Sequence, residues 1–333
     1  MNKSVKENIV ISRDRKKGYQ FGTFQGVFTP SILTILGVIM YLRFGWVLGN
    51  LGLAKTLLIV TMSTAVTFIT GLSIAQFATN MRMGGGGAYY IVSRSLGIEA
   101  GAAIGIPLFF AQALGISFYI AGFSESIVGL YPGLSLETVG IVTLIFLSIL
   151  AAISADMALK VQYVILFFLM TSLCSFFAGG YSGNPAVQPV SSVILGKASF
   201  WAVFAVFFPA VTGIEAGLAM SGDLRDPERS LPRGIISSVL VSYLIYLAIP
   251  AFLYFQRIPV QELLTNNLIM RDVARWGDFV IYGLWCASLS SALGSLLGAP
   301  RTLQALANDG IVFRFIGRGY GRKNDPRFAT MIS

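Results

Sequence analysis

The chain contains no histidine, and only 12% of its 333 residues are Asp, Glu, Lys or Arg. The lack of histidine excludes imidazole proton relays and His-based metal sites. Soluble domains usually carry about 25% charged residues, whereas this chain is 55% apolar with a mean hydropathy of +0.74. A soluble protein of this size could not bury that much apolar surface. The composition therefore excludes soluble, disordered and fibrous proteins and predicts a multi-pass membrane protein.

Cysteine is also scarce, because only Cys174 and Cys286 are present and each lies inside an apolar run. Both are interpreted as small buried residues, and no disulfide is indicated. The net charge of +9 would suggest nucleic acid as a partner of a soluble protein. In a membrane protein it indicates basic cytoplasmic loops, so the expected partners are the lipid bilayer and small solutes, with no nucleic acid. No removable signal peptide is predicted before the first apolar run.

Apolar runs separated by breakers predict an all-α integral membrane protein with eight spans. An N-terminal tail is expected over residues 1–21, followed by one transmembrane domain over residues 22–333. The predicted spans are 27–51, 56–79, 98–128, 136–155, 161–178, 200–220, 235–255 and 279–307. With these spans, a cytoplasmic N-terminus places 18 of the 24 Lys and Arg residues on the cytoplasmic side. This bias predicts that both termini are cytoplasmic in a multi-pass protein of the cell or plasma membrane.

Spans 1 and 6 are interrupted at corresponding places. Span 1 contains Pro30 and then Gly37, and span 6 contains Pro209 followed by Gly213. Breaks in mid-membrane free backbone carbonyls and amides that lipid cannot satisfy, and two breaks five spans apart indicate an inverted-repeat transporter. Freed carbonyls could replace the water around Na⁺ or K⁺, and freed amides could bind an anion. The alternative is a pair of proline kinks filled by water or by Ser and Thr side chains.

Two further segments have a functional and a structural interpretation. Ser290 and Ser291 lie on a stripe of small residues in span 8, which suits either close helix packing or a sodium ion facing a broken helix. The run Gly84–Gly87 lacks the Gly-Lys-Ser/Thr ending of a nucleotide-binding loop, so a flexible cytoplasmic connection is favoured over a phosphate cradle. The absence of histidine and of paired intramembrane carboxylates argues against a membrane-embedded enzyme.

Several motifs together resemble the cation-chloride cotransporters of the amino acid–polyamine–organocation superfamily, from about Gly22 to the C-terminus. They include Gly37-Val38-Ile39 before Leu42-Arg43, and Gly86-Gly87-Ala88-Tyr89-Tyr90 before Ser93-Arg94-Ser95-Leu96-Gly97. Others are Phe208-Pro209-Ala210 with Thr212-Gly213-Ile214, Ser221-Gly222-Asp223-Leu224 with Asp226-Pro227, and Leu289-Ser290-Ser291-Ala292-Leu293 with Ala299-Pro300.

The resemblance implies a LeuT-like inverted-repeat bundle with discontinuous spans 1 and 6. Its second repeat would be incomplete, because the family's ninth span would begin at Ser333. The implied function is electroneutral symport of Na⁺ and/or K⁺ with Cl⁻, which are transported ions and not cofactors. An amino-acid permease on the same scaffold is the alternative, because amides at the span 1 break could hold a carboxylate. A homodimer is an arrangement that the sequence leaves open.

The resemblance also implies ion sites, residue by residue. The implied ligands are Thr34, Ile35, Tyr119, Pro209 and Thr212 for potassium; Leu33, Leu36, Ala287, Ser290 and Ser291 for sodium; and Gly37, Val38, Ile39, Gly213, Ile214 and Glu215 for chloride. Arg43 and Glu125 would form the family's outer-gate ion pair.

This sequence departs from the family pattern at two of these positions. Thr34 stands where most animal members have asparagine, although its backbone carbonyl remains available. Glu215 stands where animal members have an apolar residue, and a carboxylate there would compete with a bound chloride. The serine pair of span 8 favours sodium use, whereas Pro30 resembles the potassium-chloride branch.

Overall fold

A computed structural model describes residues 21–80, 87–153, 155–183, 198–219, 221, 224–319 and 327–333. Residues 1–20 of the predicted tail and Gly84–Gly86 of the glycine run lie outside this range. Within it, the regular structure consists of helices together with one isolated parallel bridge between Phe21 and Leu224.

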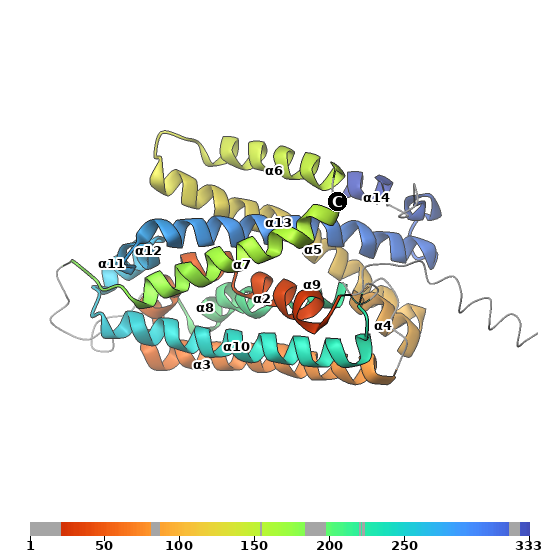
Figure 1. The fold of residues 1–333 in the computed structure, drawn as a ribbon, viewed down its shortest axis with the longest axis horizontal. Coiled ribbons are helices and arrows are strands. Elements are labelled where there is room, and N and C mark those ends of the chain that lie inside the picture. The colour runs from red at the N-terminus through yellow and green to blue at the C-terminus, as the bar shows by residue number, and fades with distance from the viewer. Residues whose placement is uncertain are drawn as a thin grey trace, which may run out of the picture.

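Figure 1 shows the described helices in their order along the chain. They are η1 (Phe24–Phe28), α2 (Thr29–Ile35), α3 (Val38–Asn80), α4 (Gly87–Ser95), α5 (Ile98–Leu130), α6 (Leu136–Ile153), α7 (Ala155–Phe177), α8 (Phe200–Phe207), η3 (Phe208–Val211), α9 (Ile214–Ala219), α10 (Pro227–Phe255), α11 (Val260–Thr265), α12 (Ile269–Val273), α13 (Gly277–Asn308), η5 (Arg314–Gly317) and α14 (Arg327–Ile332). Among the described residues, five helical stretches are long and apolar enough to cross a membrane: Phe24–Asn80, Ile98–Leu130, Phe200–Ala219, Pro227–Phe255 and Gly277–Asn308. Shorter apolar helices cover Leu136–Leu150 and Val161–Phe177.

The helix α3 contains the second half of predicted span 1 and the whole of predicted span 2. The chain changes direction at Gly52, whose φ of 70° and ψ of 173° are not helical. Glycine adopts this backbone conformation without the steric penalty that a side chain would add. The Thr56 hydroxyl donates a 2.8 Å hydrogen bond to the Gly52 carbonyl and so satisfies one backbone group at the turn.

The bundle is built by a few long helix pairs. In Figure 1, α3 and α10 run side by side, and α13 runs beside α5 and crosses α7. The helix α6 packs on α5 at the edge of the bundle, and its outer surface exposes Ile141, Phe146 and Ile149. Exposed apolar side chains on an edge helix are suited to contact with lipid tails.

The short helices α2 and α9 pack against each other in the middle of the bundle. Around them, the segment that precedes span 1 is joined to the segment that follows span 6. The Arg225 backbone N–H donates a 3.0 Å hydrogen bond to the Phe21 carbonyl, beside the bridge between Phe21 and Leu224. A Cβ added to Gly217 of α9 would lie 2.5 Å from the Ser31 Oγ of α2, so this helix pair requires glycine for its close approach.

Candidate functional site

Span 1 is broken between α2 and α3. Leu36 has a φ of −78° and a ψ of 53°, which ends α2, and α3 begins again at Val38. The Gly37 N–H donates a 2.8 Å hydrogen bond to the Ile35 carbonyl. The discontinuity predicted at Thr34–Gly37 is therefore confirmed.

Span 6 is broken between η3 and α9. The 3₁₀ turn Phe208–Val211 replaces the α-helix, and Thr212 is extended with a φ of −79° and a ψ of 163°. Gly213 has a φ of 126°, a conformation that L side chains rarely adopt. The helix then resumes at Ile214. This second discontinuity is also confirmed, and with it the LeuT-like arrangement of broken spans.

The two breaks touch each other. A Cβ on Gly213 would lie 2.8 Å from Thr34 Cγ2 and 3.1 Å from the Ile35 backbone nitrogen. Gly213 is therefore required both by its own backbone conformation and by the close approach of span 1. The contact places the candidate ligands of spans 1 and 6 around one region of the bundle.

Hydroxyls from neighbouring helices satisfy several carbonyls that the breaks release. The Tyr246 hydroxyl of α10 hydrogen-bonds to the Ile35 carbonyl, and it lies 3.0 Å from the Ala210 carbonyl. The Thr67 hydroxyl of α3 donates to the Val211 carbonyl at 3.1 Å. Neither residue could be recognised as a site residue from the sequence. The only available signal was a hydroxyl inside an apolar run, which is common in membrane helices.

The two threonines of the expected potassium set donate their hydroxyl hydrogen bonds to carbonyls of the same broken span. Thr34 donates to the Pro30 carbonyl at 2.9 Å, and Thr212 donates to the Pro209 carbonyl at 2.7 Å. Tyr119 lies on α5, is partly buried, and packs edge-on against Phe118 with ring centroids 5.7 Å apart.

The expected sodium set gathers between α2 and α13, which pack against each other. Leu33, Leu36 and Ala287 are buried. Ser291 is only 3% exposed, and within the described part of the chain its Oγ has no hydrogen-bond partner. This oxygen lies 3.9 Å from the position that a Cβ on Gly37 would take, so it faces the span 1 break. Ser290 is partly buried on the same helix.

The expected chloride residues are divided between the two breaks. Val38 and Ile39 open α3 and line a cavity of about 100 Å³ together with Phe118 and Gly122. The first amides of a helix have no partners inside the helix and carry its positive dipole end. At the other break, Ile214 begins α9 and is buried, whereas Glu215 is exposed on the surface of the described chain.

Arg43 and Glu125 also line this cavity, and together with Asn267 they form a polar cluster that we call the outer ring. Arg43 forms an ion pair with Glu125 at 2.9 Å and donates a second hydrogen bond to the Asn267 Oδ1 at 3.1 Å. The Asn267 amide donates in turn to Glu125. Asn267 lies between α11 and α12, in a connection where the sequence analysis named no site residue.

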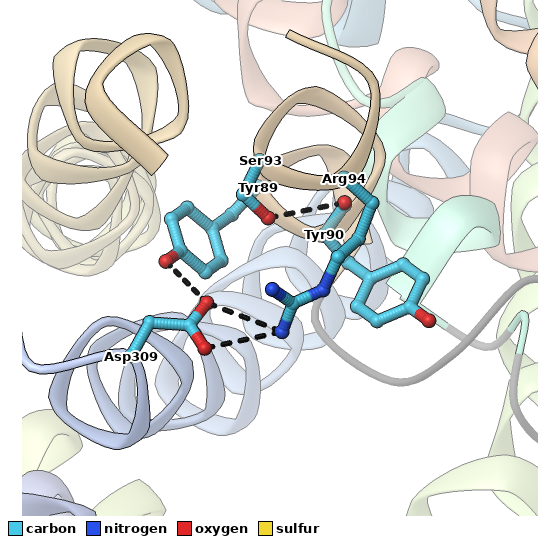
Figure 2. Close-up of polar contacts among 5 residues, drawn as sticks. All are labelled: Tyr89, Tyr90, Ser93, Arg94 and Asp309. Carbon is cyan, nitrogen blue, oxygen red and sulfur yellow. Dashed lines mark hydrogen bonds and ion pairs between the residues drawn. The ribbon is translucent and has the colours of Figure 1, made fainter. Parts of the chain in front are cut away.

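A second polar cluster ties α4 to the end of α13, as Figure 2 shows. The Tyr89 hydroxyl donates to Asp309 Oδ2 at 2.7 Å, and Arg94 pairs with Asp309 Oδ1 at 3.1 Å. The Arg94 guanidinium also lies over the Tyr90 ring, 5.5 Å from its centroid. Burial and the hydrogen bond to Asp309 raise the pKa of Tyr89, and the same carboxylate raises the pKa of Arg94. We call these residues the Asp309 cluster.

Apolar helices and two broken spans in contact define an integral membrane protein of the transporter type. Comparison with known proteins agrees with this class. The sequence profile of the amino acid permease family matches residues 26–333, so the chain belongs to that family.

The relatives are described as solute carriers and a cotransporter. The chain is 32% identical to solute carrier family 12 member 1 of Mus musculus over 369 aligned positions, covering 92% of this chain and 34% of that protein. It is 31% identical to member 2 of Mus musculus, covering 96% and 32%. It is 32% identical to a bumetanide-sensitive sodium-(potassium)-chloride cotransporter of Manduca sexta, covering 93% and 35%. The chain thus spans about a third of the length of these relatives, and the expected resemblance to cation-chloride cotransporters is confirmed.

Proposed function

We propose that the chain forms the ion-binding part of a secondary active transporter that moves Na⁺ and/or K⁺ together with Cl⁻. The observation that carries the proposal is the buried Ser291 hydroxyl, which has no hydrogen-bond partner among the described residues and faces the span 1 break, where backbone groups are released from helical bonding. A hydroxyl buried without a partner costs free energy unless a ligand uses it. A dehydrated cation would use it, because cations such as Na⁺ bind oxygen ligands.

We assign the cation ligands to the residues around the breaks. In the proposed sodium site, Ser290 and Ser291 supply hydroxyls, and Leu33, Leu36 and Ala287 supply carbonyls. In the proposed potassium site, Tyr119 and Thr212 supply hydroxyls, and Thr34, Ile35 and Pro209 supply carbonyls.

Chloride is proposed to bind at the first amides of α3, beside Val38 and Ile39, and at the start of α9 beside Gly213, Ile214 and Glu215. The residues of the first location, Val38 and Ile39, line the same cavity as Arg43 and Glu125. Here the amides and helix dipole of α3 would stabilise the anion, with the Arg43 guanidinium near the cavity mouth. The outer ring would act as the gate toward the outside.

The uptake test uses purified protein in proteoliposomes, with Na⁺, K⁺ and Cl⁻ each replaced in turn by an impermeant ion. We expect ³⁶Cl⁻ uptake to require a cation gradient and ²²Na⁺ or ⁸⁶Rb⁺ uptake to require chloride. Empty liposomes and a Ser291→Trp variant, whose side chain would fill the cation site, serve as controls. Uptake of each ion independently of the others would contradict coupled transport.

A second candidate is amino-acid transport, which the match to the amino acid permease family favours. The amides at the start of α3 could bind a substrate carboxylate in place of chloride. Uptake of a labelled amino acid without added chloride would support this candidate, whereas chloride-dependent cation uptake without any amino acid would exclude it as the main activity.

We propose that both termini are cytoplasmic, on the basis of the Lys and Arg bias of the loops. A cysteine introduced at Lys16 should then resist an impermeant thiol reagent applied to intact cells. Labelling from outside would instead indicate the opposite topology, in which the Asp309 cluster and not the outer ring lies on the external side.

A further inference from the structure

Tyr246 contacts both discontinuous spans although it belongs to neither. Its side chain comes from α10 and is fully buried, with 0% exposure. The hydroxyl hydrogen-bonds to the carbonyl of Ile35, the last residue of α2, and lies 3.0 Å from the carbonyl of Ala210 in η3. One phenol therefore joins the span 1 break to the span 6 break.

The ring has little freedom to leave this position. Phe44 of α3 and Phe207 of α8 pack edge-on against it, with centroids 5.3 and 5.9 Å away, and they also pack on each other at 5.2 Å. Beside the hydroxyl lies a cavity of about 10 Å³, lined by Thr64, Val239 and Ser242 among others. Such a volume accommodates about one water molecule and cannot accept a displaced ring.

A phenol has one proton, so it cannot donate fully to two carbonyls at the same time. Two carbonyls, on two different spans, thus share this phenol, and the Ile35 carbonyl also accepts the Gly37 N–H. The Ile35 carbonyl is one of the ligands proposed for potassium, so the present inference rests on the proposed function.

We propose that Tyr246 is a positioning residue that sets the orientation of the Ile35 carbonyl, and with it the cation selectivity of the site between the breaks. The hydrogen bond fixes a carbonyl that helical bonding no longer restrains. A fixed carbonyl maintains the size of the ion cavity, whereas a free one can turn inward and accommodate a smaller ion. The residue acts through Ile35 and does not itself contact the ion.

Tyr246→Phe tests the proposal, because it removes only the hydroxyl and leaves the ring packed against Phe44 and Phe207. The matched control is Tyr243→Phe on the same helix, whose hydroxyl hydrogen-bonds with the exposed Thr61 hydroxyl at 3.1 Å. Both variants are measured in proteoliposomes for the KM and the maximal rate with K⁺, Rb⁺ and Na⁺ as the varied cation.

We expect Tyr246→Phe to raise the KM for K⁺ about three- to tenfold, the factor that corresponds to one lost hydrogen bond. The K⁺-to-Na⁺ ratio of KM values should change, while the KM for Cl⁻ stays within twofold. Tyr243→Phe should leave all three values unchanged. A purely structural role would lower the amount of active protein, and hence the maximal rate, without changing the cation ratio.

An unchanged cation ratio in a transporting Tyr246→Phe variant would overturn the inference while leaving the proposed function intact. Absence of coupled uptake in the unmodified protein would instead refute the proposed function. If Tyr246→Phe fails to accumulate, 3-fluorotyrosine at position 246 decides the question, because it preserves the ring and provides a stronger donor. A selectivity shift relative to tyrosine supports the inference, and an identical selectivity rejects it.

Discussion

The proposed gate role of the outer ring can be tested by access to the cavity that it lines. Leu42 lines that cavity together with Arg43 and Glu125 and is only 4% exposed. We therefore place a single cysteine at Leu42, in a background in which Cys174 and Cys286 are replaced by Ser and Ala. The measured quantity is the rate at which an impermeant thiol reagent labels this cysteine from the side of α11 and α12.

The expected magnitude follows from the contacts of the ring. The Arg43–Glu125 pair is close at 2.9 Å, but its side chains are 34% and 28% exposed, so solvent screens it in part. An exposed pair contributes about 0.2–1 kcal/mol and a hydrogen bond to a charged group about 1.5–3 kcal/mol. For the partly exposed interaction of Glu125 with Arg43 we take an intermediate free energy of about 1–2 kcal/mol. Its loss corresponds to about a 5- to 30-fold change in the ratio of open to closed molecules.

Glu125→Gln should consequently raise the labelling rate by about 5- to 30-fold, and Asn267→Ala should raise it by about threefold, as expected for loss of a neutral partner. The control is Glu262→Gln, which removes a charge from the same loop region without touching the ring. If labelling of Leu42→Cys is equally fast in Glu125→Gln and in the parent, the ring does not close the cavity. A faster rate in the Glu262→Gln control would show that loop flexibility, and not the ring, limits access.

Three other changes test separate parts of the site. Ser290→Ala combined with Ser291→Gly removes two hydroxyls and little volume, so Na⁺ dependence of ⁸⁶Rb⁺ uptake should disappear; unchanged dependence would favour simple helix packing. Glu215→Gln removes a charge beside the proposed second chloride, so either the pH dependence of transport or the Cl⁻-to-cation ratio should change in flux assays. If both stay the same, Glu215 has a structural role only. A hydrogen bond to Glu262, aided by burial, raises the pKa of Tyr181 from 10.0 to about 12. Protonated Tyr181 therefore stabilises the folded state fully below pH 10, and this stabilisation is lost as the pH rises through 12. Glu262→Gln should lower the pKa of Tyr181 toward 10, as followed by ¹³C-tyrosine NMR, and an unchanged pKa would mean that burial alone causes the shift.

The broken spans could be predicted from the sequence because their cause is local. Pro209 and Gly213 disrupt helical bonding through their own backbone properties, and Gly37 does the same in span 1. The all-helical fold class and the location in a membrane could be predicted from the composition and the apolar runs. Local reasoning also placed Arg43 and Glu125 on one side of the membrane, because both lie near the same ends of their spans.

The partners of the breaks could not be predicted in this way. Tyr246 and Thr67 satisfy carbonyls from helices that are distant in sequence, and their periodicity resembles that of ordinary packing residues. Asn267 lies in a polar connection where many residues could have faced solvent. Long-range hydrogen bonds depend on which helices become neighbours, and that information is not contained in a single apolar run.

The pairing of half-helices across the two breaks has a mechanical consequence. Below the breaks, α2 packs on α9, and the Phe21–Leu224 bridge joins the segments that lead into and out of them. Above the breaks, Phe44 of α3 packs on Phe207 of α8. This cross-pairing couples each half of span 1 to one half of span 6 through packing contacts. In the proposed transporter, the coupled halves on one side of the breaks would move together while those on the other side stay in place.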